Sequence, residues 1–121
     1  MEFSRRDLAA LNIMRGRDNG LPDYNFIRKC HGLEMINEFD EINRELNITH
    51  PEIFIKLKQL YKSVDDIDLY VGGMLESTNG PGPLFSKIIK DQFRRLRDSD
   101  RFWFENKENE YFPLYTHVLR K

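Results

Sequence analysis

The sequence holds little of what marks several common classes of protein. It has one cysteine, Cys30, so no disulfide can form within the chain, and burial statistics predict a small buried thiol there. No stretch approaches the roughly 20 apolar residues of a membrane-spanning helix. No apolar segment of the kind found in a signal peptide follows the first arginines. We therefore expect no signal or transmembrane segment in this chain, which leaves the location of a longer parent protein open.

An excess of one charge is absent as well. The chain has 19 basic and 20 acidic residues and a formal net charge of −1, which gives no electrostatic reason to expect nucleic-acid binding. The three histidines are scattered, and none stands with a second ligand at metal spacing: His31, His50 and His117. We find no Ser/His/Asp grouping and no phosphate-binding glycine loop. The sequence thus predicts no metal site.

What remains is the composition of a folded domain. The chain has 121 residues, of which 40% are hydrophobic and 12% aromatic, enough for a modest core. There is no internal repeat and no low-complexity segment. We expect residues 1–121 to form a single segment.

Hydrophobic spacing predicts two short helices near the start of the chain. The first starts at Ser4, whose hydroxyl can cap the free amides, with Asp7 three residues further on. The regular pattern of this helix stops at Gly16 to Gly20. The second helix runs from Tyr24 to His31, and Gly32 is placed to end it in a left-handed conformation. The apolar residues of the first helix share one face: Leu8, Leu11 and Met14.

The middle of the chain predicts one further helix. Leu33 to Leu46 is a polar connection with a weak pattern. Thr49-x-x-Glu52, with Pro51 between them, is a capping box that opens a helix. Val64 to Met74 contains an acidic turn and then Gly72-Gly73, and Asn79 to Pro83 is a loop. The predicted apolar face of the middle helix consists of Ile53, Leu57, Leu60 and Tyr61.

The fourth helix has the clearest amphipathic pattern. Its apolar face holds Phe85, Ile88, Ile89, Phe93 and Leu96. The opposite face is basic but interrupted by aspartates, which favours a solvated surface over an RNA-binding or membrane-binding one. An aromatic cluster at Arg101 to Asn106 follows. The sequence predicts an all-α fold.

Two short motifs allow alternative interpretations. Asp65-Asp66-x-Asp68 resembles the start of a calcium loop, but the glycine and closing glutamate of an EF-hand are missing, so a solvated turn is favoured. Asn47-Ile48-Thr49 is a glycosylation acceptor sequence, which suits an extracellular protein and also occurs by chance.

Two polar residues stand out on the first helix. Asn12 shares the face of Leu8 and Leu11, an unusual position in an apolar stripe, although buried amides are usually only hydrogen-bonded structure. Arg15 lies one turn further along the same face. Its ordinary interpretation is a solvated arginine at a helix end.

Three blocks of this sequence, in the same order, resemble the animal haem peroxidase superfamily. Asn12 to Asn25 contains Arg-Gly-Arg-Asp-Asn-Gly-Leu-Pro, similar to the Arg-Gly-Arg-Asp-His-Gly-Leu-Pro segment of that family. The three blocks are residues 7–18, 66–73 and 82–106. Together they place the motif-bearing region at about residues 3–106. The resemblance implies the C-terminal part of a helical peroxidase domain. In that family the axial histidine and distal catalytic residues lie upstream of this segment.

Within the family, the sequence looks most like the peroxidase-homology domain of dual oxidases, membrane NADPH oxidases with an extracellular peroxidase-like domain. Residues 72–77 and 101–106 are similar to that branch. Asn19, which stands where most animal peroxidases have histidine, also favours it. The change lies in a loop and removes no haem ligand.

The resemblance implies roles for four residues near haem. Asn12 would accept a hydrogen bond from the axial histidine and tune the iron, and Arg15 would pair with a haem propionate. Leu8 and Leu11 would pack near the haem edge. Arg17 and Asp18 are expected to pair with neighbouring groups and to stabilise the turn.

The main hypothesis is therefore enzymatic at the level of a parent protein. Such a parent would make hydrogen peroxide from NADPH and oxygen, or carry out peroxide-dependent oxidation at a haem-binding domain. No catalytic residue is expected in this chain, and haem is not expected to be held by it alone. Its partners would be the upstream part of the peroxidase domain, the NADPH oxidase core and a maturation partner. The alternative is a haem-free peroxidase-homology module that only mediates an interaction.

Overall fold

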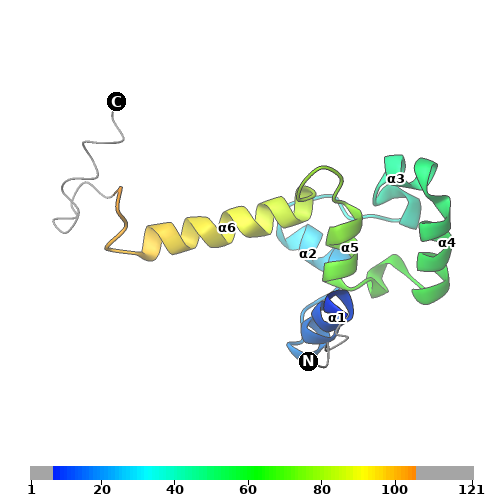
Figure 1. Ribbon diagram of the computed structural model, residues 1–121, viewed down its shortest axis with the longest axis horizontal. Coiled ribbons are helices and arrows are strands. Elements are labelled where there is room, and N and C mark those ends of the chain that lie inside the picture. Colours follow the sequence, from blue (N-terminus) through cyan, green and yellow to red (C-terminus); the bar gives the residue numbers. More distant parts are fainter. Residues whose placement is uncertain (1–6, 106–121) are drawn as a thin grey trace, which may run out of the picture. The chain divides into compact units, whose positions relative to one another are not determined.

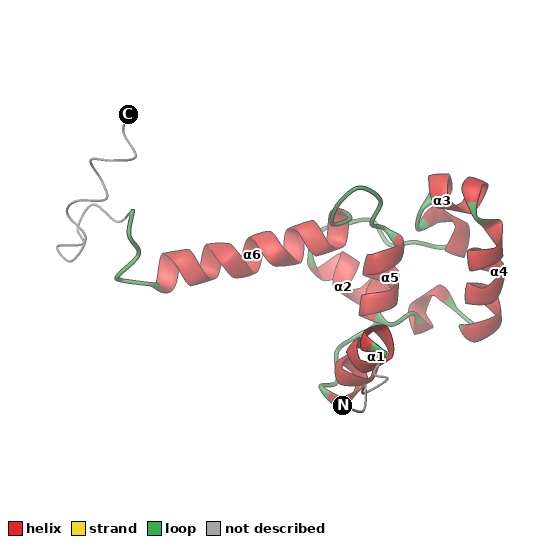
Figure 2. Cartoon of the chain, in the orientation of Figure 1, coloured by secondary structure: helices red, strands yellow, loops and turns green. Residues whose placement is uncertain are grey.

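The computed structural model describes residues 7–105, and these residues form helices joined by turns (Figure 1). In the described part the elements are α1 (Leu8–Asp18), α2 (Tyr24–Cys30), η1 (Phe39–Glu41), α3 (Arg44–Thr49), α4 (Pro51–Leu60), η2 (Val64–Asp66), α5 (Leu69–Leu75) and α6 (Pro83–Ser99). No strand occurs among these residues (Figure 2). The β pairing there is an isolated bridge between Asp23 and Asp68. The all-α prediction is confirmed.

Contacts divide the chain into two units, Met1–Lys87 and Ile88–Lys121. The first unit contains the buried apolar core of the described residues. Its side chains come from α2, from the connection after it, from α4 and from the starts of α5 and α6: Tyr24, Ile36, Ile42, Phe54, Leu57, Ile67 and Leu84.

Helix α1 begins at Leu8, later than the start at Ser4 that the sequence predicted. Asp7 Oδ1 accepts hydrogen bonds from the amides of Ala9 and Ala10, at 2.9 and 3.2 Å. Asp7 is therefore the N-cap and not the third residue of the helix, and Ser4 lies outside the described residues. Gly16 lies inside the helix, which continues to Asp18, because a glycine in a short helix weakens it without ending it.

Helix α2 agrees with its prediction. Asp23 caps it by accepting from the amide of Phe26 at 2.8 Å, and Gly32 follows it with a φ of 64°. Such a left-handed conformation suits glycine, which has no Cβ to clash.

Helix α4 begins at Pro51, as predicted, but the predicted capping box is wrong. His50 is the N-cap, and the Thr49 hydroxyl donates to the carbonyls of Glu45 and Leu46 in the preceding helix. Helix α3, a single short helix inside and after the predicted connection, was not expected. Its presence occupies the Thr49 hydroxyl, so that it cannot cap α4.

The buried face of α4 also differs from the prediction. Phe54 and Leu57 are buried, whereas Leu60 is 79% exposed and Ile53 is half-buried. The buried face of α4 is thus rotated relative to the predicted one. It is formed by Phe54 and Leu57, which lie on the same side of the helix.

Helix α5 was not predicted, and it contains Gly72 and Gly73, which the sequence analysis noted only as following an acidic turn. Both are buried in the helix. A Cβ on Gly72 would lie 2.3 Å from ring carbons of Tyr24, and one on Gly73 would lie 2.2 Å from Phe85. The glycines therefore permit two aromatic rings to approach the α5 backbone.

Helix α6 follows the predicted loop and has the predicted amphipathic pattern. Its acidic residues form ion pairs with arginines along the polar side, including Arg95 with Asp91 at 2.7 Å. After it, the rings of Trp103 and Phe104 lie 5.0 Å apart, which confirms the aromatic cluster within the described residues. No helix in residues 7–105 is long and apolar enough to cross a membrane.

Candidate functional site

A cavity of about 650 Å³ lies in the first unit beside α1. The turn after α1, the segment from η2 into α5, and the first turn of α6 complete its walls. The residues that line it are Asn12, Ile13, Arg15, Gly16, Asn19, Leu21, Pro22, Asp23, Asp66, Ile67, Asp68, Leu69, Tyr70 and Phe85. A cavity of this size with apolar walls and a few polar groups is typical of a small-molecule or cofactor site.

Asn12 and Arg15 both line this cavity, so the structure brings these two predicted site residues together. Asn12 is half-buried and Arg15 is exposed. Among residues 7–105, neither side chain makes a hydrogen bond or ion pair. An amide and a guanidinium one helical turn apart are thus available to a ligand.

Leu8 and Leu11 do not share this position. Neither lines the cavity; Leu8 is 70% exposed and Leu11 is half-buried. Their role near a haem edge stays a prediction. The apolar wall of the cavity comes from elsewhere, in particular from Ile67 and from Tyr70 and Phe85, whose ring centroids are 6.5 Å apart.

Asp68 forms a charged part of the wall, and its partners come from two other segments. It accepts two hydrogen bonds from Arg17, at 2.9 Å to Nε and 2.7 Å to Nη2, and a third at 2.6 Å from the Tyr61 hydroxyl. The bonds from Arg17, and then from Tyr61, hold the pKa of the Asp68 carboxyl below its usual value. Burial, reinforced by the Asp68 hydrogen bond, raises the pKa of Tyr61 to about 12.

This geometry corrects two predictions. Arg17 pairs with a residue 51 positions away and not with a neighbour in its own turn. Asp68 is not in a solvated turn, since its side chain is only 16% exposed. Sequence spacing could not show either, because the contact depends on how α1 packs near the start of α5.

Asn19 acts within α1. As the C-cap residue it donates through Nδ2 to the carbonyl of Arg15 at 2.8 Å, and its backbone amide donates to the same oxygen at 3.0 Å. Its side chain therefore helps to end the helix beside the cavity.

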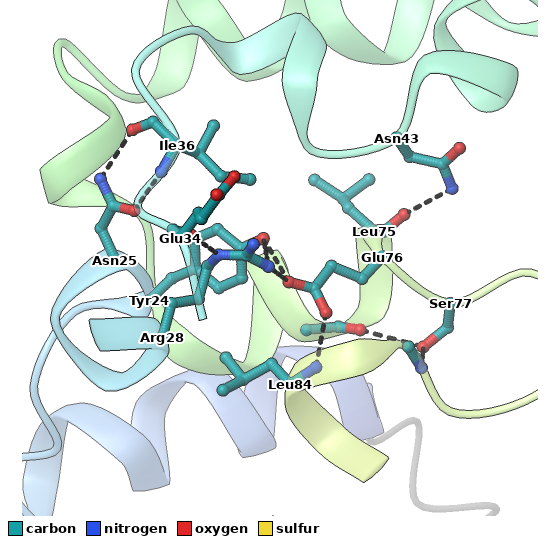
Figure 3. A network of polar contacts seen from close by, with 12 residues as sticks. Tyr24, Asn25, Arg28, Glu34, Ile36, Asn43, Leu75, Glu76, Ser77 and Leu84 are labelled. Carbon is teal, nitrogen blue, oxygen red and sulfur yellow. Dashed lines mark hydrogen bonds and ion pairs between the residues drawn. The ribbon is translucent and has the colours of Figure 1, made fainter. Parts of the chain in front are cut away.

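A second polar cluster lies in the core of the first unit (Figure 3). Glu76, with 2% of its side chain exposed, accepts hydrogen bonds from the Tyr24 hydroxyl at 2.5 Å and from the Leu84 amide at 2.8 Å, and it pairs with Arg28. Burial, and next the hydrogen bond to Glu76, raises the pKa of Tyr24. Since these groups satisfy one another, the cluster joins α2, α5 and α6.

Asn25 is the other buried polar side chain of the described residues. It donates to the Ile36 carbonyl and accepts from the Ile36 amide, both at 2.8 Å, and donates to Asp65 at 2.8 Å (Figure 3). The sequence offered no signal for Asn25 or Glu76, because each lies next to residues that are ordinary for a helix or a turn.

The remaining candidates do not converge on a site. In residues 7–105 no three His, Cys, Asp or Glu side chains are placed to hold a metal ion. His50 lies 3.2 Å from Glu52, and His117 falls outside the described range. Cys30 is exposed at the last residue of α2, so its predicted burial is wrong.

The Asn47 acceptor sequence lies inside α3. Asn47 is half-buried and the Thr49 hydroxyl is hydrogen-bonded to the helix backbone. Its glycosylation stays a prediction.

Comparison with known proteins connects this geometry to a family. The family model for animal haem peroxidase matches residues 1–117. The chain is 58% identical to a dual oxidase of Drosophila melanogaster over 123 aligned residues, which cover 100% of the chain and 8% of that protein. It is 43% identical to dual oxidase 2 of Homo sapiens, over 92% of the chain and 7% of that protein.

A solved structure extends the likeness to the fold. Peroxidase A from Dictyostelium discoideum aligns with a TM-score of 0.75 and 38% identity, over 94% of this chain and 21% of that one. The chain therefore spans a small share of the proteins that it matches. Sequence and fold agree that the chain belongs to the animal haem peroxidase family.

Proposed function

We propose that α1 forms part of the haem-binding wall in a larger peroxidase domain. The observation that supports this is the joint position of Asn12 and Arg15 on one cavity, with both side chains unpaired among the described residues. The residues fit a haem in chemical terms. An amide oxygen can accept an imidazole N–H, a guanidinium suits a propionate carboxylate, and Ile67, Tyr70 and Phe85 offer apolar contact.

In this proposal Asn12 orients the axial imidazole supplied by the upstream part of the domain. An acceptor on the ring N–H makes the imidazole a stronger donor to iron. Arg15 would pair with a propionate, and Leu8 and Leu11, which lie outside the cavity lining, would pack near the haem edge. When bound, the haem supplies the redox chemistry with peroxide; this chain contributes binding and orientation, with no catalytic residue of its own.

For the whole protein we propose a dual-oxidase-type activity, on the basis of the similarity to the dual oxidases. It would produce hydrogen peroxide from NADPH and oxygen, or use peroxide for oxidation at the haem domain. The upstream peroxidase segment, the NADPH oxidase core and a maturation partner would be its partners, at an extracellular or membrane-associated location.

The test uses a chimera in which this chain replaces the matching 21% of Peroxidase A. Asn12→Ala removes the acceptor and should raise the Fe(III)/Fe(II) potential by an amount on the order of tens of millivolts, with lower peroxidase turnover. Asn12→Asp should lower the potential, because it places a negative charge near the imidazole. Potentiometric titration measures both.

Leu57→Ala is the control. It removes a buried side chain of α4 and should lower stability by about 2–5 kcal/mol with no specific change in potential. If neither Asn12 variant moves the potential of a haem-loaded chimera, Asn12 is an ordinary amide and the proposal fails. A chimera that folds without taking up haem would favour the alternative, a haem-free interaction module.

The isolated 121-residue chain provides a separate check. Since the proposal assigns the axial ligand to another part of the domain, we expect no tight haem binding by this chain alone. Hemin titration followed by visible spectroscopy measures it. A sharp Soret shift at low micromolar hemin, lost when one histidine is replaced, contradicts the proposal.

A further inference from the structure

Helix α1 carries Asn12 and Arg15, yet it has little apolar anchoring. None of its residues is buried; Leu8 and Met14 are 70% and 52% exposed, and Leu11 and Ile13 are half-buried. Most helices in proteins are held by an amphipathic face that packs on the core. The orientation of α1 must therefore depend to an unusual degree on its polar contacts.

The strongest polar contact of α1 is at its last turn. The guanidinium of Arg17 donates hydrogen bonds to the Asp68 carboxylate from both Nε and Nη2, at 2.9 and 2.7 Å. A two-point bond between planar groups fixes their mutual angle, which a single contact does not. Arg17 is 66% exposed, so solvent screens its charge, and the two-point geometry of the bond is what orients α1.

Asp68 is itself rigidly held. Its carboxylate also accepts from Tyr61 at 2.6 Å, and its backbone pairs with that of Asp23 in the isolated bridge. The residue before it, Ile67, is fully buried, and the residue after it begins α5. Asp68 thus provides a fixed point on the core.

Arg17 follows Arg15 by two residues and Asn12 by five. Because each residue of an α-helix turns by about 100°, fixing the direction of one side chain fixes the azimuth of all the others. A rotation of α1 about its own axis by about 100°, the angle between successive residues, would turn Asn12 and Arg15 away from the cavity. Asp68 lines the same cavity.

We infer that Asp68 is a positioning residue, which through Arg17 sets the orientation of α1 and so points Asn12 and Arg15 into the cavity. The part concerning haem rests on the proposed function. The part concerning α1 does not, since it can be measured in the chain alone. Tyr61 supports Asp68 from the other side and shares this role.

The first experiment is hydrogen–deuterium exchange on the full 121-residue chain. In Asp68→Asn, which keeps the shape of the side chain, the amides of α1 should exchange about tenfold faster, because a charge-assisted bond is lost. Amides of α4 and α5 should be unchanged. Asp68 makes no side-chain capping bond to α5, so the substitution removes no cap there.

Two further variants test whether the effect is specific to the bond between Arg17 and Asp68. Asp40→Asn breaks another ion pair of the first unit, with Lys58 at 3.0 Å, in which the aspartate is more exposed than Asp68, and it should leave α1 exchange as in the wild type. Arg17→Lys keeps the charge, loses the two-point bond and leaves the core untouched. It should accelerate α1 exchange even if Asp68→Asn unfolds the chain. Unchanged α1 exchange in Arg17→Lys, or equal acceleration in α4 and α5, overturns the inference.

The second experiment uses the haem-loaded chimera and resonance Raman spectroscopy of the iron–histidine stretch. Asp68→Asn should shift this band in the same direction as Asn12→Ala, and Asp40→Asn should not shift it. If Asn12→Ala shifts the band while Asp68→Asn leaves it unchanged, the positioning role is wrong and the proposed function stands. If Asn12→Ala has no effect, the proposed function fails, while the exchange experiment still decides whether Asp68 orients α1.

Discussion

At the scale of single residues, the charges of this chain fall into two groups with different effects. Glu76 is buried and has three hydrogen-bond donors, whereas the carboxylates on α6 pair with arginines at the surface. Removing one partner of a buried pair leaves the other charge without compensation, which is far more costly than breaking an exposed pair. Whether a charge is buried or exposed therefore determines how much its ion pair contributes to the free energy of unfolding.

We therefore predict that Glu76→Gln lowers the free energy of unfolding by about 3–5 kcal/mol, because Arg28 keeps a buried charge with no counter-ion. Urea denaturation measures the change. Asp91→Asn, which breaks the exposed pair with Arg95, should change the same quantity by less than about 1 kcal/mol. Equal effects of the two substitutions would show that the core cluster contributes no more than a surface pair.

The Asp68 carboxyl should make stability depend on acid pH. Its pKa in the folded chain is below the usual 3.8, chiefly because of the hydrogen bonds from Arg17, so the unfolded state takes up a proton first as pH falls. The contribution is therefore fully present above the unfolded pKa and is lost as pH falls through the folded pKa. Unfolding free energies of the wild type and Asp68→Asn, measured from about pH 6 to pH 2, should converge at the acid end. A difference that stays constant over this range would contradict the prediction.

At the scale of elements, α5 depends on close approach. Gly72 and Gly73 let Tyr24 and Phe85 lie directly against its backbone, although two glycines reduce the intrinsic helix propensity of a seven-residue helix. Tertiary contacts with aromatic rings offset that loss.

Gly72→Ala should consequently destabilise the chain by about 1–3 kcal/mol, since the new Cβ would overlap the Tyr24 ring and overpacking outweighs the gain in propensity. Gly16→Ala is the matched control on α1. Its Cβ would meet only Leu21, at an ordinary 3.7 Å, so the change should stabilise by about 0.4–1 kcal/mol. Thermal or urea unfolding of both variants measures whether each substitution lowers or raises the free energy of unfolding. Stabilisation by Gly72→Ala would show that Tyr24 moves aside freely.

At the scale of the whole molecule, the described residues expose several large apolar side chains. The aromatic cluster contributes Phe102 and Phe104, at 43% and 38% exposure. The apolar side of α6 exposes more: Ile89 is 44%, Phe93 69% and Leu96 60% exposed. Exposed apolar side chains in this number favour association.

We predict concentration-dependent self-association of the isolated chain, visible by analytical ultracentrifugation. Phe93→Glu should shift the distribution toward monomer, because it puts a charge on the apolar side of α6. Arg94→Glu changes the adjacent polar side and should have a smaller effect. A chain that stays monomeric at all concentrations would indicate that this surface is not associative.

The amino-acid sequence by itself determined the helical class, the ends of α2, the loop before α6 and the family. These follow from local causes: capping aspartates, glycines with positive φ, prolines at helix starts and an amphipathic repeat. The motif around Asn12 and Arg15 was readable because both residues lie on one helix, at a spacing that puts them on one face.

Only the tertiary structure decided which residues meet. The predicted face of α4, the burial of Cys30 and the solvated turn at Asp68 were wrong, because each depends on residues distant in sequence. The capping role of Thr49 was wrong for a local reason, since its hydroxyl bonds to carbonyls of α3. Phe54 replaces Leu60 in the core, and Asp68 finds Arg17 across 51 positions. Gly72 and Gly73 lie within α5, a helix that the sequence did not predict, and rings from α2 and α6 pack on them. Periodicity describes a helix, but the direction that the helix faces is set by what packs against it.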